Sequence, residues 1–151
     1  MIAIGGWNDS EGNKYSRMVN DPAKRRAFVD DVIQFIEKHN FDGLDLDWEY
    51  PKCWQVDCNK GPASDKPAFA ALVKELHDKF KPRGWLVSAA VSPSYNVLDQ
   101  GYDVPALSKY LDLINVMTYD YHGQWDKKTG HVAPMTDHDE ADDARFNTVS
   151  S

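Results

Sequence analysis

Residues 41–51 read Phe-Asp-Gly-Leu-Asp-Leu-Asp-Trp-Glu-Tyr-Pro, and four of these eleven residues are acidic. Asp45, Asp47 and Glu49 alternate with apolar residues, which is the period of a β-strand. The three acids therefore share one face, with same-face neighbours about 7 Å apart. Buried carboxylates must be paired, hydrogen-bonded or protonated. The pattern predicts a strand from Gly43 to Glu49 that carries a functional site.

The alternative is a half-exposed antiparallel strand whose acidic face lies in water. Two features count against it. Three like charges with no Lys or Arg between them repel one another on one strand face. Strands also favour Thr, Tyr or Val over Asp.

Composition limits the classes of protein that the chain can represent. Its 151 residues, 42% hydrophobic and 27% charged, predict one globular domain with a core. The formal net charge of −7 argues against nucleic acid or an anionic membrane surface as a partner. No apolar run reaches about 18 residues, so no membrane span is expected. Nor does the start of the sequence show the pattern of a signal peptide.

Two amphipathic helices are expected. The first begins at Asp21-Pro22, a capping residue followed by a proline in the first turn, and ends at His39-Asn40. The second is capped by Ser64 or Asp65 and is ended by Pro82 and Gly84. Their apolar stripes are Phe28, Val32, Phe35 and Ile36 in the first, and Phe69, Leu72, Val73, Leu76 and Phe80 in the second.

Four strands and a third, short helix complete the expected elements. The strands are 1–4, 43–49, 85–91 and 113–119, and the short helix is 103–110, with Leu107 and Leu111 pointing inward. Residues 7–20, 50–63 and 92–101 are expected to be loops, and the acid-rich segment 137–143 a solvated loop.

Continuous apolar strands separated by helices predict an α/β fold with a parallel sheet. Right-handed crossovers place the carboxyl end of every strand at the same rim, where ligands bind in such folds. The glycines and aromatic residues at the strand ends converge there with the acids. These residues are Gly5, Gly6, Trp7, Glu49, Tyr50, Tyr119 and Asp120.

The cysteines, Cys53 and Cys58, are separated by four residues. This spacing suits a small disulfide loop and an oxidising compartment, and it matches no zinc pattern. The alternative is a pair of free thiols in a cytosolic protein. No set of metal ligands is apparent, and no cofactor is predicted.

Residues 42–49, Asp-Gly-Leu-Asp-Leu-Asp-Trp-Glu, resemble the Asp-x-x-Asp-x-Asp-x-Glu motif of glycoside hydrolase family 18 chitinases. Three further segments are similar to this family in order and spacing. Residues 3–7 resemble its third barrel strand, 86–91 its fifth, and 117–123, with Met-x-Tyr-Asp, its sixth. The loop between Cys53 and Cys58 is similar to that of secreted arthropod chitinases.

The resemblance implies a (β/α)8 TIM barrel of which this chain covers strands three to six. Residues 1–151 are therefore expected to form a partial catalytic domain, with two unpaired apolar edge strands. The implied location is extracellular. The implied substrate is chitin or chitooligosaccharides, and the oligomeric state is left open.

Roles for the acids follow from residue type and from the resemblance. Glu49 is the last carboxyl on the strand and is expected to donate the proton, which needs a raised pKa. Asp47 raises that pKa by like-charge coupling, and Asp45 takes up the shared proton. The resemblance implies that the N-acetyl oxygen of the sugar is the nucleophile, held by Asp47 and Tyr119.

The resemblance also implies residues that contact the sugar. Met117 lines the N-acetyl pocket, and Asp120 contacts the sugar and supports the donor. Trp125 stacks on a sugar ring, the alternative being a loop residue that covers the core. Trp7 and Tyr50 are rim aromatics of the same kind. Asp42 is out of phase with the other acids and is expected to be structural, as are Gly5 and Gly6.

Three functions are compatible with these observations. The first is an endo-type chitin hydrolase. The second is a chitin-binding lectin or inactive fragment on the same fold, and retention of Glu49 disfavours the lectin. The third is a metal-dependent hydrolase or isomerase with the acids as ligands, which the strand spacing and the lack of histidine partners disfavour.

Overall fold

The structure is a computed structural model that describes residues 1–137, 145 and 147–150. In this part of the chain one four-stranded sheet has the order β1-β2-β3-β4, and every neighbouring pair is parallel. The strands are β1 (Ile2–Gly5), β2 (Gly43–Asp47), β3 (Leu86–Val91) and β4 (Leu113–Val116). The predicted α/β class with a parallel sheet is confirmed.

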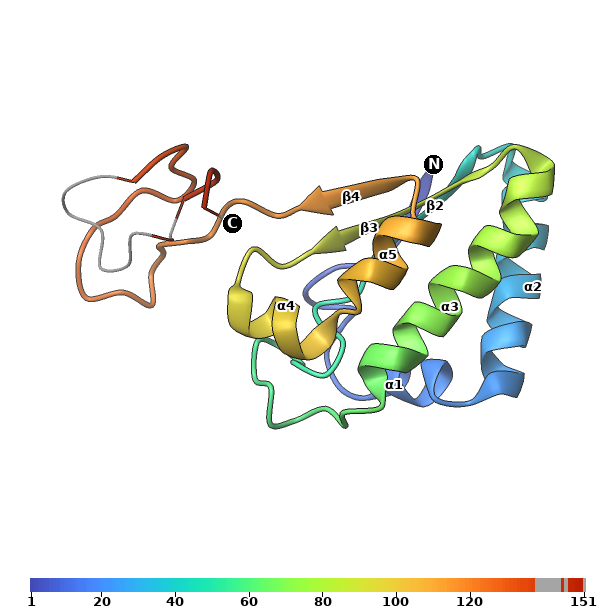
Figure 1. Cartoon of the computed structure of the whole chain (residues 1–151), viewed down its shortest axis with the longest axis horizontal. Coiled ribbons are helices and arrows are strands. Elements are labelled where there is room, and N and C mark those ends of the chain that lie inside the picture. The colour runs from blue at the N-terminus through green and yellow to red at the C-terminus, as the bar shows by residue number, and fades with distance from the viewer. Residues whose placement is uncertain (138–144, 146, 151) are drawn as a thin grey trace.

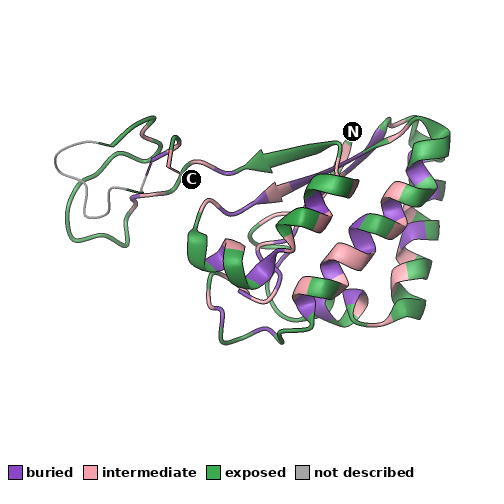
Figure 2. Cartoon of the chain, in the orientation of Figure 1, coloured by how far each residue is buried: buried purple, intermediate pink, exposed green. Residues whose placement is uncertain are grey.

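The helices lie on one side of the sheet (Figure 1). They are α1 (Lys14–Val19), α2 (Pro22–His39), α3 (Asp65–Phe80), the 3-10 helix η1 (Lys81–Arg83), α4 (Tyr95–Gly101) and α5 (Val104–Tyr110). Helix α3 contacts β3 and α2 contacts β2, and buried residues line their inner surfaces (Figure 2). The hydrophobic core therefore lies between the helices and this face of the sheet.

Helix α2 begins and ends where the sequence predicts. The Asp21 carboxylate accepts the N–H groups of Ala23 at 2.9 Å and Lys24 at 3.3 Å, and Asn40 ends the helix in the left-handed region with φ 55°. Its predicted apolar stripe is wrong in one member. Phe35 is 47% exposed and stacks on Phe41 beyond the helix end, while Val29 and Ile33 point into the core.

The stripe of α3 is confirmed, since Phe69, Leu72, Val73, Leu76 and Phe80 are all buried. Ser64 occupies the N-cap position, as predicted, but its side chain makes no capping hydrogen bond and so does not cap the helix. The side chain of Asp65 is fully buried among polar groups from other segments. Helix α5 is also confirmed, with Asp103 accepting the Ala106 N–H at 3.1 Å. Leu107 is buried, and Leu111 packs partly buried against the core.

Two predicted loops contain helices. Residues 7–20 include α1, and residues 92–101 include α4. Each helix has six or seven residues, too few to show a helical period, and isolated helices of this length are unstable in water. Packing supplies their stability, since α1 contacts both α2 and α3, and Val97 of α4 is buried.

Two strands end earlier than predicted. β2 ends at Asp47 because β1 ends opposite it, at Gly5, so that Trp48 and Glu49 continue beyond the paired region. β4 ends at Val116, where its pairing with Val91 stops, so Met117 and Tyr119 also lie past the sheet. Residues 138–143 of the predicted acidic loop lie outside the described residues.

β4 is an edge strand whose Leu113, Ile114 and Val116 are 53%, 41% and 43% exposed. Beyond it the chain leaves the helix-covered part of the sheet (Figure 1). In the described part of the chain, no helix combines the length and apolar character needed to cross a membrane.

The predicted disulfide between Cys53 and Cys58 is confirmed. Cys53 is fully buried and Cys58 is 8% exposed, so the bond belongs to the interior of the loop that follows β2. The loop closes on itself ahead of α3, since the Gly61 N–H donates to the Lys52 carbonyl at 3.0 Å.

Candidate active site

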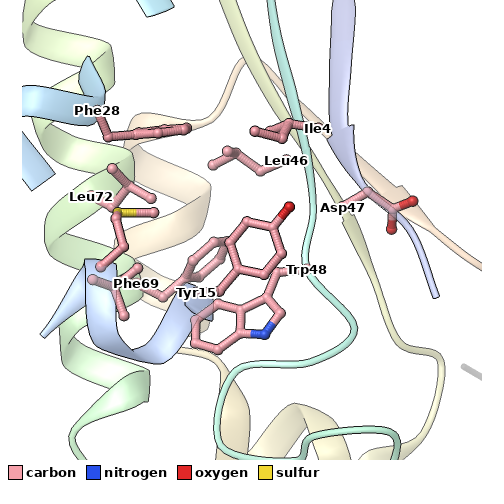
Figure 3. Close-up of a pocket in the computed structure, with 10 residues that line it drawn as sticks. Ile4, Tyr15, Phe28, Leu46, Asp47, Trp48, Phe69 and Leu72 are labelled. Atoms are coloured by element: carbon pink, nitrogen blue, oxygen red, sulfur yellow. The ribbon is translucent and has the colours of Figure 1, made fainter. Parts of the chain in front are cut away.

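The two faces of β2 differ as the alternation predicts. Leu44 and Leu46, followed by Trp48, are 3–4% exposed and point into the core. The Asp47 side chain points the opposite way, away from Leu46, Trp48 and the apolar helix residues (Figure 3). The tight pocket drawn there is lined mainly by core side chains, and the Asp47 carboxylate points away from it.

Asp45 is tied to two neighbouring strands. Its Oδ1 atom accepts a short hydrogen bond from the hydroxyl of Ser88 on β3 and a 3.3 Å hydrogen bond from the amide of Asn115 on β4. Ser88 is 2% exposed. The deepest of the three carboxylates is therefore held by a polar row that crosses β2, β3 and β4.

Asp47 is held by its backbone and left free at its carboxylate. Its carbonyl accepts the Gly6 N–H at 2.7 Å, and its Oδ1 atom is buried with no hydrogen-bond partner among the described residues. Burial, and secondarily the charge of Asp45, raises the pKa of Asp47. The carboxylate is thus poised to bind a proton or a hydrogen-bond donor.

The backbone of Gly5 lies so close to the backbone of Asp47 that position 5 requires glycine. Gly5 has φ 120°, and a Cβ atom there would lie 2.0 Å from the Asp47 carbonyl oxygen. Only glycine tolerates both conditions, which gives Gly5 the structural role predicted for it. Gly6 has φ 88° and donates its N–H to the same carbonyl.

Glu49 lies just beyond the end of β2. Its N–H donates to the hydroxyl of Ser10 at 2.9 Å, and the peptide bond to Tyr50 is cis. Burial raises the pKa of Glu49, the charges of Asp47 and Asp120 raise it further, and an interaction with the Tyr50 hydroxyl lowers it. The net direction is upward, as a general acid near neutral pH requires.

Three tyrosines lie close enough to Asp47 and Glu49 to interact with their charges. Tyr50 is 7% exposed and Tyr102 is 2% exposed, and burial raises the pKa of both hydroxyls above the usual value. Tyr119 is 51% exposed, and partial burial together with the charges of Asp47, Glu49 and Asp120 raises its pKa. All three are neutral hydrogen-bond donors at physiological pH.

The predicted sugar-contacting residues lie at different depths. Met117 is 8% exposed, whereas Trp7 and Trp125 are 47% and 63% exposed. Trp125 therefore does not cover the core. The Trp7 carbonyl accepts from the Gln55 amide at 2.8 Å, which ties the loop after β1 to the disulfide loop. Asp120 has a left-handed backbone with φ 55° and its charge reaches Glu49 and Tyr119.

Asp42, predicted to be structural, has an exposed side chain at the start of β2. Its carbonyl oxygen accepts the Leu86 N–H at 2.9 Å. Among the described residues, no group of three or more His, Cys, Asp or Glu side chains is arranged to hold a metal ion.

Sequence reasoning missed Ser10, Ser88, Asn115 and Tyr102. Ser88 and Asn115 interrupt otherwise apolar strands, and this interruption was the signal that could have revealed them. Ser10 and Tyr102 lie in segments predicted to be polar loop or the approach to a short helix. No local pattern marks them.

The chain belongs to the glycosyl hydrolases family 18, whose sequence model matches residues 1–151. It is 63% identical over 146 residues to a probable chitinase 10 of Drosophila melanogaster and 44% identical over 127 residues to an endochitinase of Manduca sexta. The matches cover 97% and 83% of this chain, but 6% and 22% of those proteins.

Solved structures agree with these relatives. The catalytic domain 2 of a Group II chitinase from Ostrinia furnacalis has a TM-score of 0.97 and 62% identity, covering 99% of this chain and 39% of that one. A mutant of the same domain was solved in complex with penta-N-acetylchitooctaose, (NAG)5. This family has the TIM-barrel fold, and the four parallel strands fit part of such a barrel.

Proposed function

We propose that this chain is part of a catalytic domain that hydrolyses the β-1,4 bonds of N-acetylglucosamine polymers in an endo manner. The observation that carries the proposal is the alternation of Asp45, Asp47 and Glu49 with the buried residues Leu46 and Trp48, with the Asp47 side chain directed away from the core and the pKa values of Asp47 and Glu49 raised. Chitinases with 44–63% identity over most of this chain support the substrate class.

Glu49 donates the proton to the leaving oxygen. It lies past the end of the strand, at the rim, while Asp45 is fixed within the sheet by Ser88 and Asn115. A carboxyl with a raised pKa remains protonated closer to neutral pH, and its partner Asp47 carries the charge that helps to raise it. Asp45 then accepts the shared proton in a relay through Asp47.

The nucleophile is the N-acetyl oxygen of the substrate, as befits a family outside the two-carboxylate scheme. The Asp47 carboxylate accepts the N–H of the acetamido group, and the Tyr119 hydroxyl donates to the acetamido oxygen. The two hydrogen bonds orient the group, and the negative charge of the Asp47 carboxylate stabilises the positive charge that forms on it. The protein therefore supplies an acid and an orienting site and needs no nucleophile of its own.

The remaining rim residues bind the sugar chain. Met117 lines the pocket for the acetamido methyl group, and Asp120 contacts the sugar and supports Glu49. Trp125 and Trp7 are exposed aromatic surfaces on which sugar rings stack, whereas Tyr50, at 7% exposed, offers little ring surface for stacking. The oligosaccharide in the related Ostrinia structure supports a chain-like ligand.

The extent and location of the domain are part of the proposal. The chain spans 39% of the catalytic-domain structure that it matches, so residues 1–151 are proposed to be one part of a complete barrel. The buried disulfide supports an oxidising, extracellular location.

Glu49→Gln in the full-length parent enzyme tests the assignment. Gln keeps the shape but donates no proton of useful strength, so turnover of a fluorogenic chitobioside should fall about 10²–10⁴-fold with chitooligosaccharide binding retained. Glu37→Gln, on the exposed surface of α2, is the matched control and should turn over normally. Turnover of Glu49→Gln within tenfold of the parent would refute the role of Glu49.

A further inference from the structure

We propose that Ser10 is a positioning residue that fixes the backbone of Glu49 relative to Asp47. The inference rests on the proposed function, since it assigns to Ser10 the placement of the proton donor. Ser10 lies in the loop between β1 and α1, and its side chain is fully buried.

One hydroxyl bridges two peptide groups. The Ser10 oxygen accepts the Glu49 N–H at 2.9 Å, and its hydroxyl donates to the Asp47 carbonyl at 3.3 Å. Ser10 is itself held in place by its own N–H, which donates to the Gly6 carbonyl at 2.8 Å. The hydroxyl of Ser10 therefore fastens the loop after β1 to the backbone of both Asp47 and Glu49, at the carboxyl end of β2.

The bridge replaces strand pairing at the point where pairing ends. Gly5 is the last residue of β1 and lies opposite Asp47, so no residue of β1 is available to accept the Glu49 N–H. A serine hydroxyl offers one donor and two acceptor sites, and both kinds are used here. Alanine would leave the Glu49 N–H and one acceptor site on Asp47 unpaired, and the backbone of Glu49 would move.

The position of Glu49 decides both its reach and its proton affinity. A catalytic group displaced by about 1 Å can cost about 10²-fold in rate. The titratable groups that interact electrostatically with Glu49 are Asp47 on β2, Tyr50, Tyr102, Tyr119 and Asp120. Displacement away from Asp47 and Asp120 lets the pKa of Glu49 fall toward its ordinary value.

The test compares Ser10→Ala with Ser16→Ala in the full-length parent enzyme. Ser16 is also a buried serine, 7% exposed, but its hydroxyl donates to Asp65 at 2.6 Å and not to the site. Steady-state turnover, oligosaccharide binding, the pH dependence of kcat/KM and thermal unfolding are measured for both. Each variant loses a buried hydroxyl, so a merely structural effect appears in both.

We expect Ser10→Ala to lower kcat about 10–100-fold with little change in KM, and to move the alkaline limb of the pH profile to lower pH. Ser16→Ala should unfold at lower temperature but keep the kcat and pH profile of the parent. Ser10→Thr and Ser10→Val, which have nearly the same volume, should differ because only threonine keeps the hydroxyl. Should Ser10→Ala itself fail to fold, this second pair decides.

The inference is overturned if Ser10→Ala loses no more kcat than Ser16→Ala with an unmoved pH profile, or if threonine is no faster than valine. Glu49→Gln, measured beside these variants, distinguishes failure of the positioning role of Ser10 from failure of the proposed function. An inactive Glu49→Gln with a fully active Ser10→Ala refutes only the positioning role. An active Glu49→Gln refutes the proposed function itself.

Discussion

Asp65 is a buried carboxylate whose removal should destabilise the protein strongly. Its side chain is fully buried and accepts four hydrogen bonds from two other segments of the chain. One oxygen accepts from Ser16 Oγ at 2.6 Å and Asn20 Nδ2 at 2.7 Å. The other accepts from Lys52 N at 3.2 Å and Trp54 Nε1 at 3.0 Å. The residue therefore joins α1, α3 and the disulfide loop.

The cost of Asp65→Ala follows from which donors can find another acceptor. Asn20 Nδ2 already has the Ser16 carbonyl at 2.9 Å, and the Ser16 hydroxyl can rotate. The Lys52 N–H and the Trp54 indole N–H are fixed by the loop and are left unpaired. At about 1–3 kcal/mol for each unsatisfied buried donor, the free energy of unfolding should fall by about 2–6 kcal/mol.

Urea unfolding of a protein that contains the complete catalytic domain, followed by tryptophan fluorescence, measures this change. Asp78→Asn is the control on the same helix, because Asp78 is 52% exposed in its surface ion pair with Lys74. Exposed pairs contribute about 0–1 kcal/mol. A loss below about 1 kcal/mol for Asp65→Ala, or an equal loss for Asp78→Asn, would refute the reasoning.

Three further predictions concern the site, the disulfide and the edges. The pKa of the Asp47 carboxyl is higher in the folded protein than its ordinary value of 3.8 in the unfolded chain, so the folded protein binds a proton there more readily. The free energy of unfolding therefore falls as the pH rises from the unfolded-state pKa through the folded-state pKa. Asp47→Asn should therefore gain melting temperature relative to the parent at pH 7 but not at pH 3; a pH-independent difference would contradict this. Replacing both Cys53 and Cys58 by serine should cost about 2 kcal/mol in urea unfolding, from the entropy of the small loop that the bond closes, and an unchanged midpoint would argue against a stabilising bond. The 151 residues expressed alone should be poorly soluble and nearly inactive, because β4 leaves Leu113, Ile114 and Val116 exposed at an open edge; a soluble monomer on size-exclusion chromatography with the turnover of a full-length relative would show that four strands suffice.

The sequence by itself determined the elements whose signals are local. The cap at Asp21, the left-handed stop at Asn40 and the stripe of α3 each depend on residues within a few positions or turns of one another. The alternation along residues 43–49 likewise separates an apolar face from an acidic face in the sequence alone. Because side chains alternate at every residue of a strand, that separation does not depend on the rest of the fold.

Only the tertiary structure decided which polar residues serve the site and where the strands end. Ser10 meets Glu49 across 39 positions of sequence, and Asn115 meets Asp45 across 70. Asp65 looked like a helix cap, yet its partners lie on α1 and in the disulfide loop. β2 stops at Asp47 because β1 has ended beside it. Such contacts are formed by segments that the fold brings together, so the partner of each residue is set by its neighbours in space. A polar residue in an apolar strand, such as Asn115, can mark a position in the sequence but does not name its partner.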